Sequence, residues 1–163
     1  MNEALKIIES IFMAAIPVLE QKAAIPFAME ARFGFFSSGV SLSMWQAYLF
    51  TLLGAVLPAA FILLFIPRVF QFLKRFKGLG KLVEWYEHRS MKKGKNIVRY
   101  EQLGLFLFVA LPLPFTGVWT GSAVAALIGL EFKKSIVTVI AGAMVCGWIV
   151  MAVYLGLINL FWM

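Results

Sequence analysis

Three long uncharged runs constrain this sequence more than any other feature. They cover residues 44–66, 103–130 and 135–163 and are 23, 28 and 29 residues long. An α-helix needs about 20 consecutive apolar residues to cross the hydrocarbon core of a bilayer. Charged residues make up 14% of the chain, against about 25% in a soluble domain. We therefore expect an all-α integral membrane protein, and the composition excludes a soluble globular enzyme, a disordered chain and a disulfide scaffold.

The run at 103–130 contains prolines that a single spanning helix does not accommodate. Pro112 and Pro114 stand two residues apart, and each proline removes a backbone donor and clashes with the preceding turn. We predict a re-entrant hairpin over about 101–131, with two helical arms and an unwound tip. Free backbone groups at such a tip bind substrates or ions. The residues assigned to this tip are Pro112, Pro114, Thr116, Gly117, Trp119 and Thr120.

Small residues recur at every fourth position after this tip. Gly117, Gly121, Ala125 and Gly129 form a ladder that favours close contact between helices. A packing kink is therefore the alternative to a binding tip. We expect both roles together, because a broken tip needs a tightly packed arm to hold it.

Residues 4–36 hold two short apolar arms that prolines and charges interrupt. Pro17 and Pro26 fall within these arms, and neither arm is long enough to cross a bilayer. We predict a first re-entrant hairpin with both prolines near its tip. Such a hairpin is tolerated at membrane depth only where protein or water covers it. An aqueous loop between short helices is the alternative.

Four ionisable side chains of this segment are the charges that we expect at membrane depth. A charge at the bilayer centre costs about 2.5–3.5 kcal/mol on insertion scales, so an ionisable group there is functional by default. A buried glutamate of this kind is suited to proton exchange near neutral pH. The predicted substrate or proton site therefore comprises Glu20, Lys22, Glu30 and Arg32.

Ten of the 15 basic residues lie between Arg68 and Arg99, opposed by two glutamates. The positive-inside rule places this segment in the cytoplasm. We expect an amphipathic connection on the membrane surface that binds anionic lipid head groups. Its predicted lipid contacts are Lys74, Arg75, Lys77 and Lys81. Nucleic acid is the other partner that such a cluster suggests, and the position between two membrane segments argues against it.

These elements predict one membrane domain, residues 1–163, built from two repeats of inverted topology. Interrupted apolar segments at matching places in two halves are typical of secondary transporters. We expect a multi-pass protein of the inner (cytoplasmic) membrane. The predicted parts are a first repeat 1–66, with the hairpin at 4–36 and a transmembrane helix at 44–66; the basic connection 67–100, of which 68–99 is cytoplasmic; and a second repeat 101–163, with the hairpin at 101–131 and a transmembrane helix at 135–160.

Two stretches of the chain carry a family resemblance. The sequences EQKAAIPFAME at 20–30 and ALPLPFTGVWTG at 110–121 resemble the small multidrug export protein family of prokaryotes. That family is similar in turn to the DedA (VTT-domain) membrane proteins. The resemblance implies a transporter with two re-entrant hairpins of opposite orientation.

The DedA resemblance also implies roles for particular positions. In DedA proteins, acidic residues of the first hairpin and arginines of the second are essential, and lipid-carrier translocation or proton-linked export is assigned. Glu20 and Glu30 match the acidic positions, whereas Ala110 and Phe115 stand about where the arginines would fall. That departure argues against recognition of a phosphate-headed lipid, which normally relies on arginine or lysine.

We therefore expect a proton-coupled secondary transporter or lipid flippase that moves a small amphipathic molecule or lipid head group between the two tips. A non-transporting assembly or lipid-organising protein is the alternative. A membrane-embedded lipid-acting enzyme is disfavoured, because the chain has no aspartate and its lone histidine, His88, lies outside the apolar segments. We expect no catalytic residue, no metal site and no cofactor, and we expect a homo-oligomer, with a dimer as the simplest form.

Overall fold

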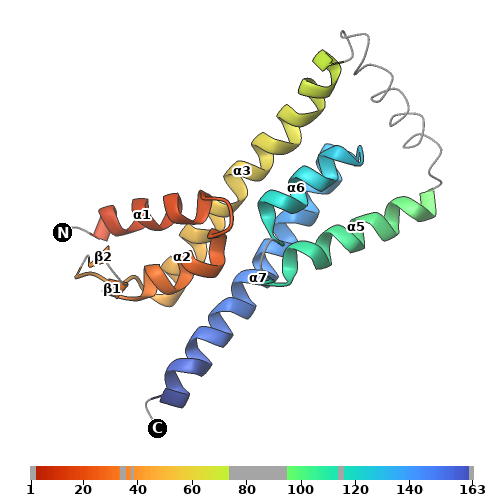
Figure 1. Ribbon diagram of the computed structural model, residues 1–163. Coiled ribbons are helices and arrows are strands. Elements are labelled where there is room, and N and C mark those ends of the chain that lie inside the picture. The colour runs from red at the N-terminus through yellow and green to blue at the C-terminus, as the bar shows by residue number, and fades with distance from the viewer. Residues whose placement is uncertain (1–2, 34–35, 38, 74–94, 114–115, 162–163) are drawn as a thin grey trace.

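The computed structural model describes residues 3–33, 36–37, 39–73, 95–113 and 116–161, and these residues are almost entirely helical (Figure 1). The helices are α1 (Glu3–Ala15), α2 (Glu20–Met29), α3 (Met44–Leu73), α5 (Lys95–Ala110), α6 (Val118–Leu127) and α7 (Phe132–Phe161). Two short strands, β1 (Arg32–Phe33) and β2 (Phe36–Ser37), pair antiparallel after α2. The predicted all-α class is confirmed apart from this small ribbon.

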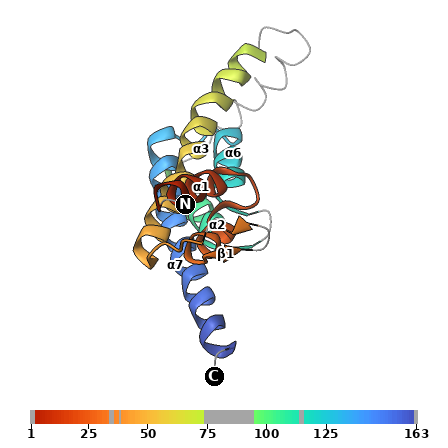
Figure 2. The same ribbon diagram turned by 90° about the vertical axis from the view of Figure 1, so that its left-hand side faces the viewer.

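The helices α3 and α7 are the two long elements of the molecule. Each has 30 residues, or about 45 Å at 1.5 Å per residue, against about 30 Å for the hydrocarbon core of a bilayer. Within them, Met44–Val69 and Phe132–Gly156 are long and apolar enough to cross a membrane. Their C-terminal ends lie at opposite ends of the molecule (Figures 1 and 2).

The outer face of α3 is apolar. Five large side chains at four-residue spacing are each more than half exposed, and they are Trp45, Leu49, Leu53, Leu57 and Phe61. A continuous exposed apolar stripe of this length is typical of a surface that contacts lipid.

The four shorter helices form two helical hairpins. Residues 16–19 join α1 to α2, and residues 111–117 join α5 to α6. The predicted break at the two prolines of the second hairpin is confirmed, because α5 ends at Ala110 and α6 begins at Val118. The hairpins lie on opposite sides of the pair of long helices, α1 and α2 on the left and α5 and α6 on the right, and their tips point toward each other (Figure 1).

The two halves of the chain make corresponding contacts. A Cβ atom on Gly54, ten residues after the start of α3, would lie 2.2 Å from the carbonyl oxygen of Ile11 in α1. A Cβ atom on Gly142, ten residues after the start of α7, would lie 3.1 Å from the carbonyl oxygen of Phe106 in α5. The first arm of each hairpin therefore packs on a glycine of the long helix of its own half.

The second arms of the hairpins pack across the two halves. Helix α6 packs against α3 more extensively than against α7, and α2 packs against both α3 and α7. A buried cluster of small and branched side chains joins α3, α5, α6 and α7. Its members include Ala55, Ala59, Leu63, Val109, Ala125, Val139 and Ala143.

The predicted ends of the transmembrane helices were wrong. Helix α3 does not end at residue 66 but continues through Pro67 to Leu73. The guanidinium of Arg68 donates to the carbonyl of Leu64 at 2.9 Å, and it thereby satisfies one carbonyl near the proline. Helix α7 begins at Phe132 and not at 135.

The start of the basic connection was also placed wrongly. Residues 68–73 continue α3, and residues 95–99 already belong to α5, because apolar neighbours carry each helix past the first charges. The predicted lipid contacts lie outside the described residues. They are Lys74, Arg75, Lys77 and Lys81.

The first hairpin differs from its prediction in the place of one proline. Helix α1 begins at Glu3, close to the expected start of the hairpin. Pro26 lies inside α2 and not at the tip. The turn falls earlier, at Pro17, so Glu20 opens the second arm.

The predicted packing ladder is correct only in its middle. Gly121 and Ala125 are buried, and a Cβ atom on Gly121 would lie 2.6 Å from Cγ2 of Val109. Gly129 is exposed, has a φ of +69°, and ends α6 because its N–H donates to Ala126. It is a helix-terminating glycine and not a packing residue.

Candidate functional site

The carboxylate of Glu20 lies between the two hairpin tips. Glu20 opens α2, is 5% exposed, and its Oε1 accepts the backbone N–H of Trp119 in the first turn of α6 at 2.9 Å. The N-terminus of a helix carries free N–H groups and partial positive charge. A carboxylate from the first hairpin therefore caps the helix that the broken tip of the second hairpin begins.

Gly117 makes this approach possible. It precedes α6 with a φ of +149°, and a Cβ atom on it would lie 1.9 Å from Oε2 of Glu20. We expected Gly117 both at the tip and in helix packing; it lies at the tip, where the absence of a side chain leaves room for a carboxylate. Glu20 itself has a φ of +44°, a left-handed conformation that costs a non-glycine residue about 1–3 kcal/mol and persists where surrounding structure imposes it.

Lys22 makes the reciprocal contact with the second tip. Its ammonium donates to the carbonyl of Leu113 at 2.7 Å and to the carbonyl of Thr116. The same Nζ lies 3.8 Å from Oε2 of Glu20. One acidic and one basic side chain of the first hairpin thus bind, respectively, a donor and two acceptors of the second hairpin.

Trp119 adds a contact from a side chain of the second hairpin to the backbone of the first. Its indole Nε1–H donates to the carbonyl of Ala15, the last residue of α1, at 3.0 Å. A small pocket of about 60 Å³ lies between the two tips. It is lined by Pro17, Val18, Glu20, Thr116, Trp119 and Thr120.

The structure thus brings most of the predicted site residues into one place. Glu20 and Lys22 meet the second tip, as described above, whereas Glu30 lies two turns further along α2. Its Oε1 accepts the phenol O–H of Tyr154 in α7 at 2.9 Å. The backbone of Arg32 pairs with Ser37, and its side chain lies outside the described part of the chain, as does Pro114.

A groove runs from Lys22 to Tyr154 along the contact between α2 and α7. Its volume is about 270 Å³. Apart from these two residues it is lined by Pro26, Pro112, Val150 and Val153. The two prolines therefore belong to the wall of this groove.

Lys6 is a buried charge that the sequence-based prediction missed. Its side chain is 1% exposed, and its Nζ lies 3.7 Å from the ring centroid of Phe27 in α2 without a hydrogen-bond acceptor among the described residues. The spacing of Lys6, Ser10 and Ala14, all buried on one face of α1, was the signal available. A lone lysine on a helical stripe of small residues points toward a neighbouring helix.

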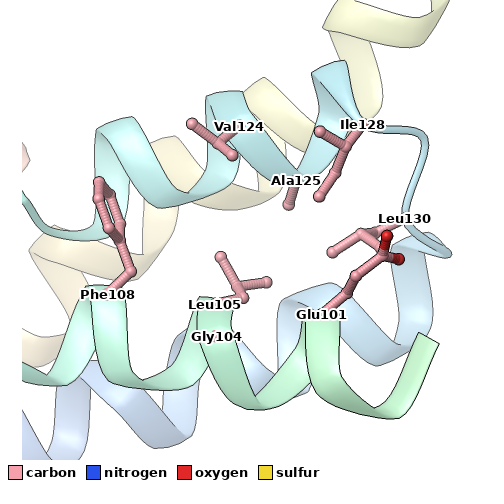
Figure 3. A pocket seen from close by; sticks show the side chains of 8 residues that line it. All are labelled: Glu101, Gly104, Leu105, Phe108, Val124, Ala125, Ile128 and Leu130. Carbon is pink, nitrogen blue, oxygen red and sulfur yellow. The ribbon is translucent and has the colours of Figure 1, made fainter. Parts of the chain in front are cut away.

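A second groove, within the second hairpin, is almost wholly apolar. Figure 3 shows side chains of α5 and α6 facing one another across it, with the carboxylate of Glu101 at one end. Its volume is about 230 Å³. With one polar side chain at its margin, it offers less for recognition than the junction of the tips. Among the described residues, there is also no group of three side chains suited to hold a metal ion.

Comparison with protein families assigns the chain. The family model described as "Putative small multi-drug export protein" matches residues 20–149, which is most of the sequence. The chain belongs to the small multidrug export protein family. Comparisons with curated proteins and with solved structures gave no match.

The family match covers Glu20, Lys22 and Trp119, three of the residues that meet between the hairpin tips. The matched span begins at Glu20 and includes Lys22, Trp119 and both long helices as far as residue 149. Together with the two long apolar helices, membership identifies a membrane protein. Lys6 and Tyr154 lie outside the matched span.

Proposed function

We propose that this membrane protein is a secondary transporter whose translocation site lies between the two hairpin tips. One observation carries the proposal: the buried carboxylate of Glu20 is held by the main chain of the opposite hairpin, beside Lys22. Ionisable groups inside a membrane domain are costly and mark substrate, ion or proton pathways. We propose no catalytic activity for this protein.

The proposed mechanism is alternating exposure of this site. Each hairpin dips into the membrane from one side, and the bonds between the tips close the path between the two sides. Separation of the tips breaks the Trp119–Glu20 and Lys22–Leu113 hydrogen bonds and exposes both side chains to one aqueous compartment. Glu20 then gains or loses a proton there, and this exchange is coupled to movement of a small amphipathic molecule or lipid head group.

The proposed topology places residues 68–99 in the cytoplasm and the protein in the inner membrane. The excess of basic residues in this segment supports that orientation. The corresponding contacts at Gly54 and Gly142 support a relation between two halves inserted in opposite directions. We also propose that the basic segment binds anionic lipid head groups and that the protein is a homo-oligomer.

The test is a transport assay with purified protein in liposomes. An imposed pH gradient is followed with an internal pH dye while a panel of small amphipathic cations, anions and zwitterions is added. We expect substrate-dependent dissipation of the gradient by the wild type and a loss of at least about tenfold for Glu20→Gln, because the exchangeable proton is removed while the side-chain volume is kept.

The matched control is Glu131→Gln, because Glu131 is exposed and pairs with Lys134 at 2.5 Å away from the tips. Size-exclusion profiles establish that each variant is folded. Transport by Glu20→Gln at the wild-type rate, or an equal loss in Glu131→Gln, contradicts the proposed role of Glu20. Absence of any flux with intact lipid binding supports a lipid-organising protein in its place.

A further inference from the structure

The groove between α2 and α7 has a polar group at each end and apolar walls between them. Lys22 and Pro26 of α2 and Glu30, the residue that caps its C-terminus, stand four residues apart, so they follow one face of the helix. Lys22 lines one end of the groove, and Tyr154 of α7 lines the other and donates to Glu30. Eight residues of helix separate the two ends by about 12 Å.

The charge at the Lys22 end is already compensated. Its ammonium donates to two carbonyls of the second tip and lies 3.8 Å from the carboxylate of Glu20. An anionic ligand would have to displace these partners. This end therefore contributes little net attraction for a free anion.

The charge at the opposite end has a neutral hydrogen-bond partner. The carboxylate of Glu30 accepts the phenol of Tyr154 at 2.9 Å, and a phenol carries no positive charge at neutral pH. Lys6 of α1 also interacts with the Glu30 carboxylate electrostatically, but its ammonium is against the ring of Phe27 and it does not line the groove. A carboxylate thus lies next to the Tyr154 end of the groove, and an ammonium that is already hydrogen-bonded lines the other end.

The middle of the groove suits a hydrophobic body. Pro26 and Pro112 have no N–H to satisfy, and Val150 and Val153 complete the wall. Val153 is 55% exposed, so the groove is open along that side and accepts a ligand larger than its 270 Å³. Apolar walls with one oriented charge are the usual composition of a small-molecule site.

We propose that this groove binds lipophilic organic cations, with the cationic centre beside Glu30 and Tyr154 and the apolar groups between the two prolines. The inference rests on the proposed transport function, and it names the substrate class of that transporter. Lys22 is shared by the groove and the tip site, so a bound cation lies next to the pair that closes the path.

The test measures binding without transport. Tetraphenylphosphonium is titrated against purified protein in nonionic detergent by equilibrium dialysis, with tetraphenylborate as an anion of the same shape. We expect saturable binding of the cation and weaker binding of the anion. Glu30→Gln is expected to weaken cation binding at least about tenfold, since a charge-assisted contact becomes a neutral one.

A second variant tests the groove without changing any charge. Val153→Trp places an indole in the open side and is expected to abolish saturable binding of tetraphenylphosphonium. Val137→Trp is its matched control, because Val137 is an exposed valine of the same helix, 65% exposed, that does not line the groove. Glu131→Gln is the corresponding control for Glu30→Gln.

The outcomes separate this proposal from the proposed function. Equal binding by Glu30→Gln or Val153→Trp and their controls, or preferential binding of tetraphenylborate, overturns the cation site. Transport of anions or lipids that depends on Glu20 would then leave the proposed function standing. Saturable binding that needs Glu30, in a protein that transports nothing, supports the site and contradicts the transporter.

Discussion

The two hairpins have similar backbones but supply different chemistry to their junction. In both, the first arm runs toward a proline, Pro17 or Pro112, and packs on a glycine of the following long helix. The first hairpin brings side-chain charges, Glu20 and Lys22, on a short turn. The second brings free backbone donors and acceptors on a longer break.

This difference shows how two hairpins can bury charge at their junction without two opposed ionic side chains across it. The groups of the second hairpin that bind Glu20 and Lys22 are main-chain groups, which proline and glycine free from helical bonding. Charged side chains are therefore needed in only one of the two hairpins, in α2. The two hairpins are therefore complementary and not interchangeable, and three experiments test that conclusion.

The largest expected effect is that of Gly117→Ala. The added Cβ would lie 1.9 Å from Oε2 of Glu20 at a residue with a φ of +149°, so we expect a loss of at least about 3 kcal/mol of stability. Thermal unfolding in detergent measures it. The control is Gly104→Ala, where no atom lies within 4 Å of the new Cβ and helix propensity predicts a gain of about 0.5–1 kcal/mol. Equal stability of the two variants would show that the tips are not in contact.

A paired substitution compares the two halves directly. In Gly54→Ala the new Cβ meets a backbone oxygen at 2.2 Å, whereas in Gly142→Ala the nearest atom is Cβ of Val109 at 2.8 Å. We expect losses of about 2–3 and about 1–2 kcal/mol respectively, because overpacking costs more where the backbone itself must shift. Gly156→Ala is the control, with no atom within 4 Å. A larger loss at Gly142 than at Gly54 would contradict the described packing.

The smallest expected effect is that of Lys6→Met. Lys6 stands eleven residues before Pro17, and the position eleven before Pro112 is Glu101, so the two hairpins differ in charge here as well. Removing an ammonium that is buried without a hydrogen-bond acceptor among the residues that the structure describes is expected to raise stability by about 1 kcal/mol, since desolvation outweighs the contact with Phe27. Thermal midpoints measure the gain. Lys133→Met, at an exposed position of α7, is expected to change nothing. A lower midpoint for Lys6→Met would show that the ammonium stabilises the hairpin.

The sequence was sufficient to predict the break in the second hairpin. Two prolines two residues apart exclude a continuous helix, and the structure has its break there. Uncharged runs likewise identified α3 and α7. Helix ends were less predictable, because α3 continues through Pro67 to Leu73 although the proline supplies no backbone N–H.

The contacts between the hairpins were beyond sequence reasoning of this kind. Glu20 and Trp119 are 99 residues apart, and no local pattern states which carboxylate caps which helix. The sequence did identify Glu20 and Lys22 as candidates through the cost of charge in a membrane. It missed Lys6 because that cost was not applied to the first arm, and it placed Pro26 at a tip because α2 tolerates a proline in its interior.

The pairing of Glu20 with Lys22 has an electrical consequence. A negative and a positive charge 3.8 Å apart sum to zero, so their joint displacement moves no net charge through the field of the membrane. A single elementary charge crossing 100 mV changes energy by about 2.3 kcal/mol, and a neutral pair avoids that term. If Glu20 and Lys22 move together when the tips separate, that movement carries no net charge. Any voltage dependence of the transport cycle must then come from the proton or the cargo.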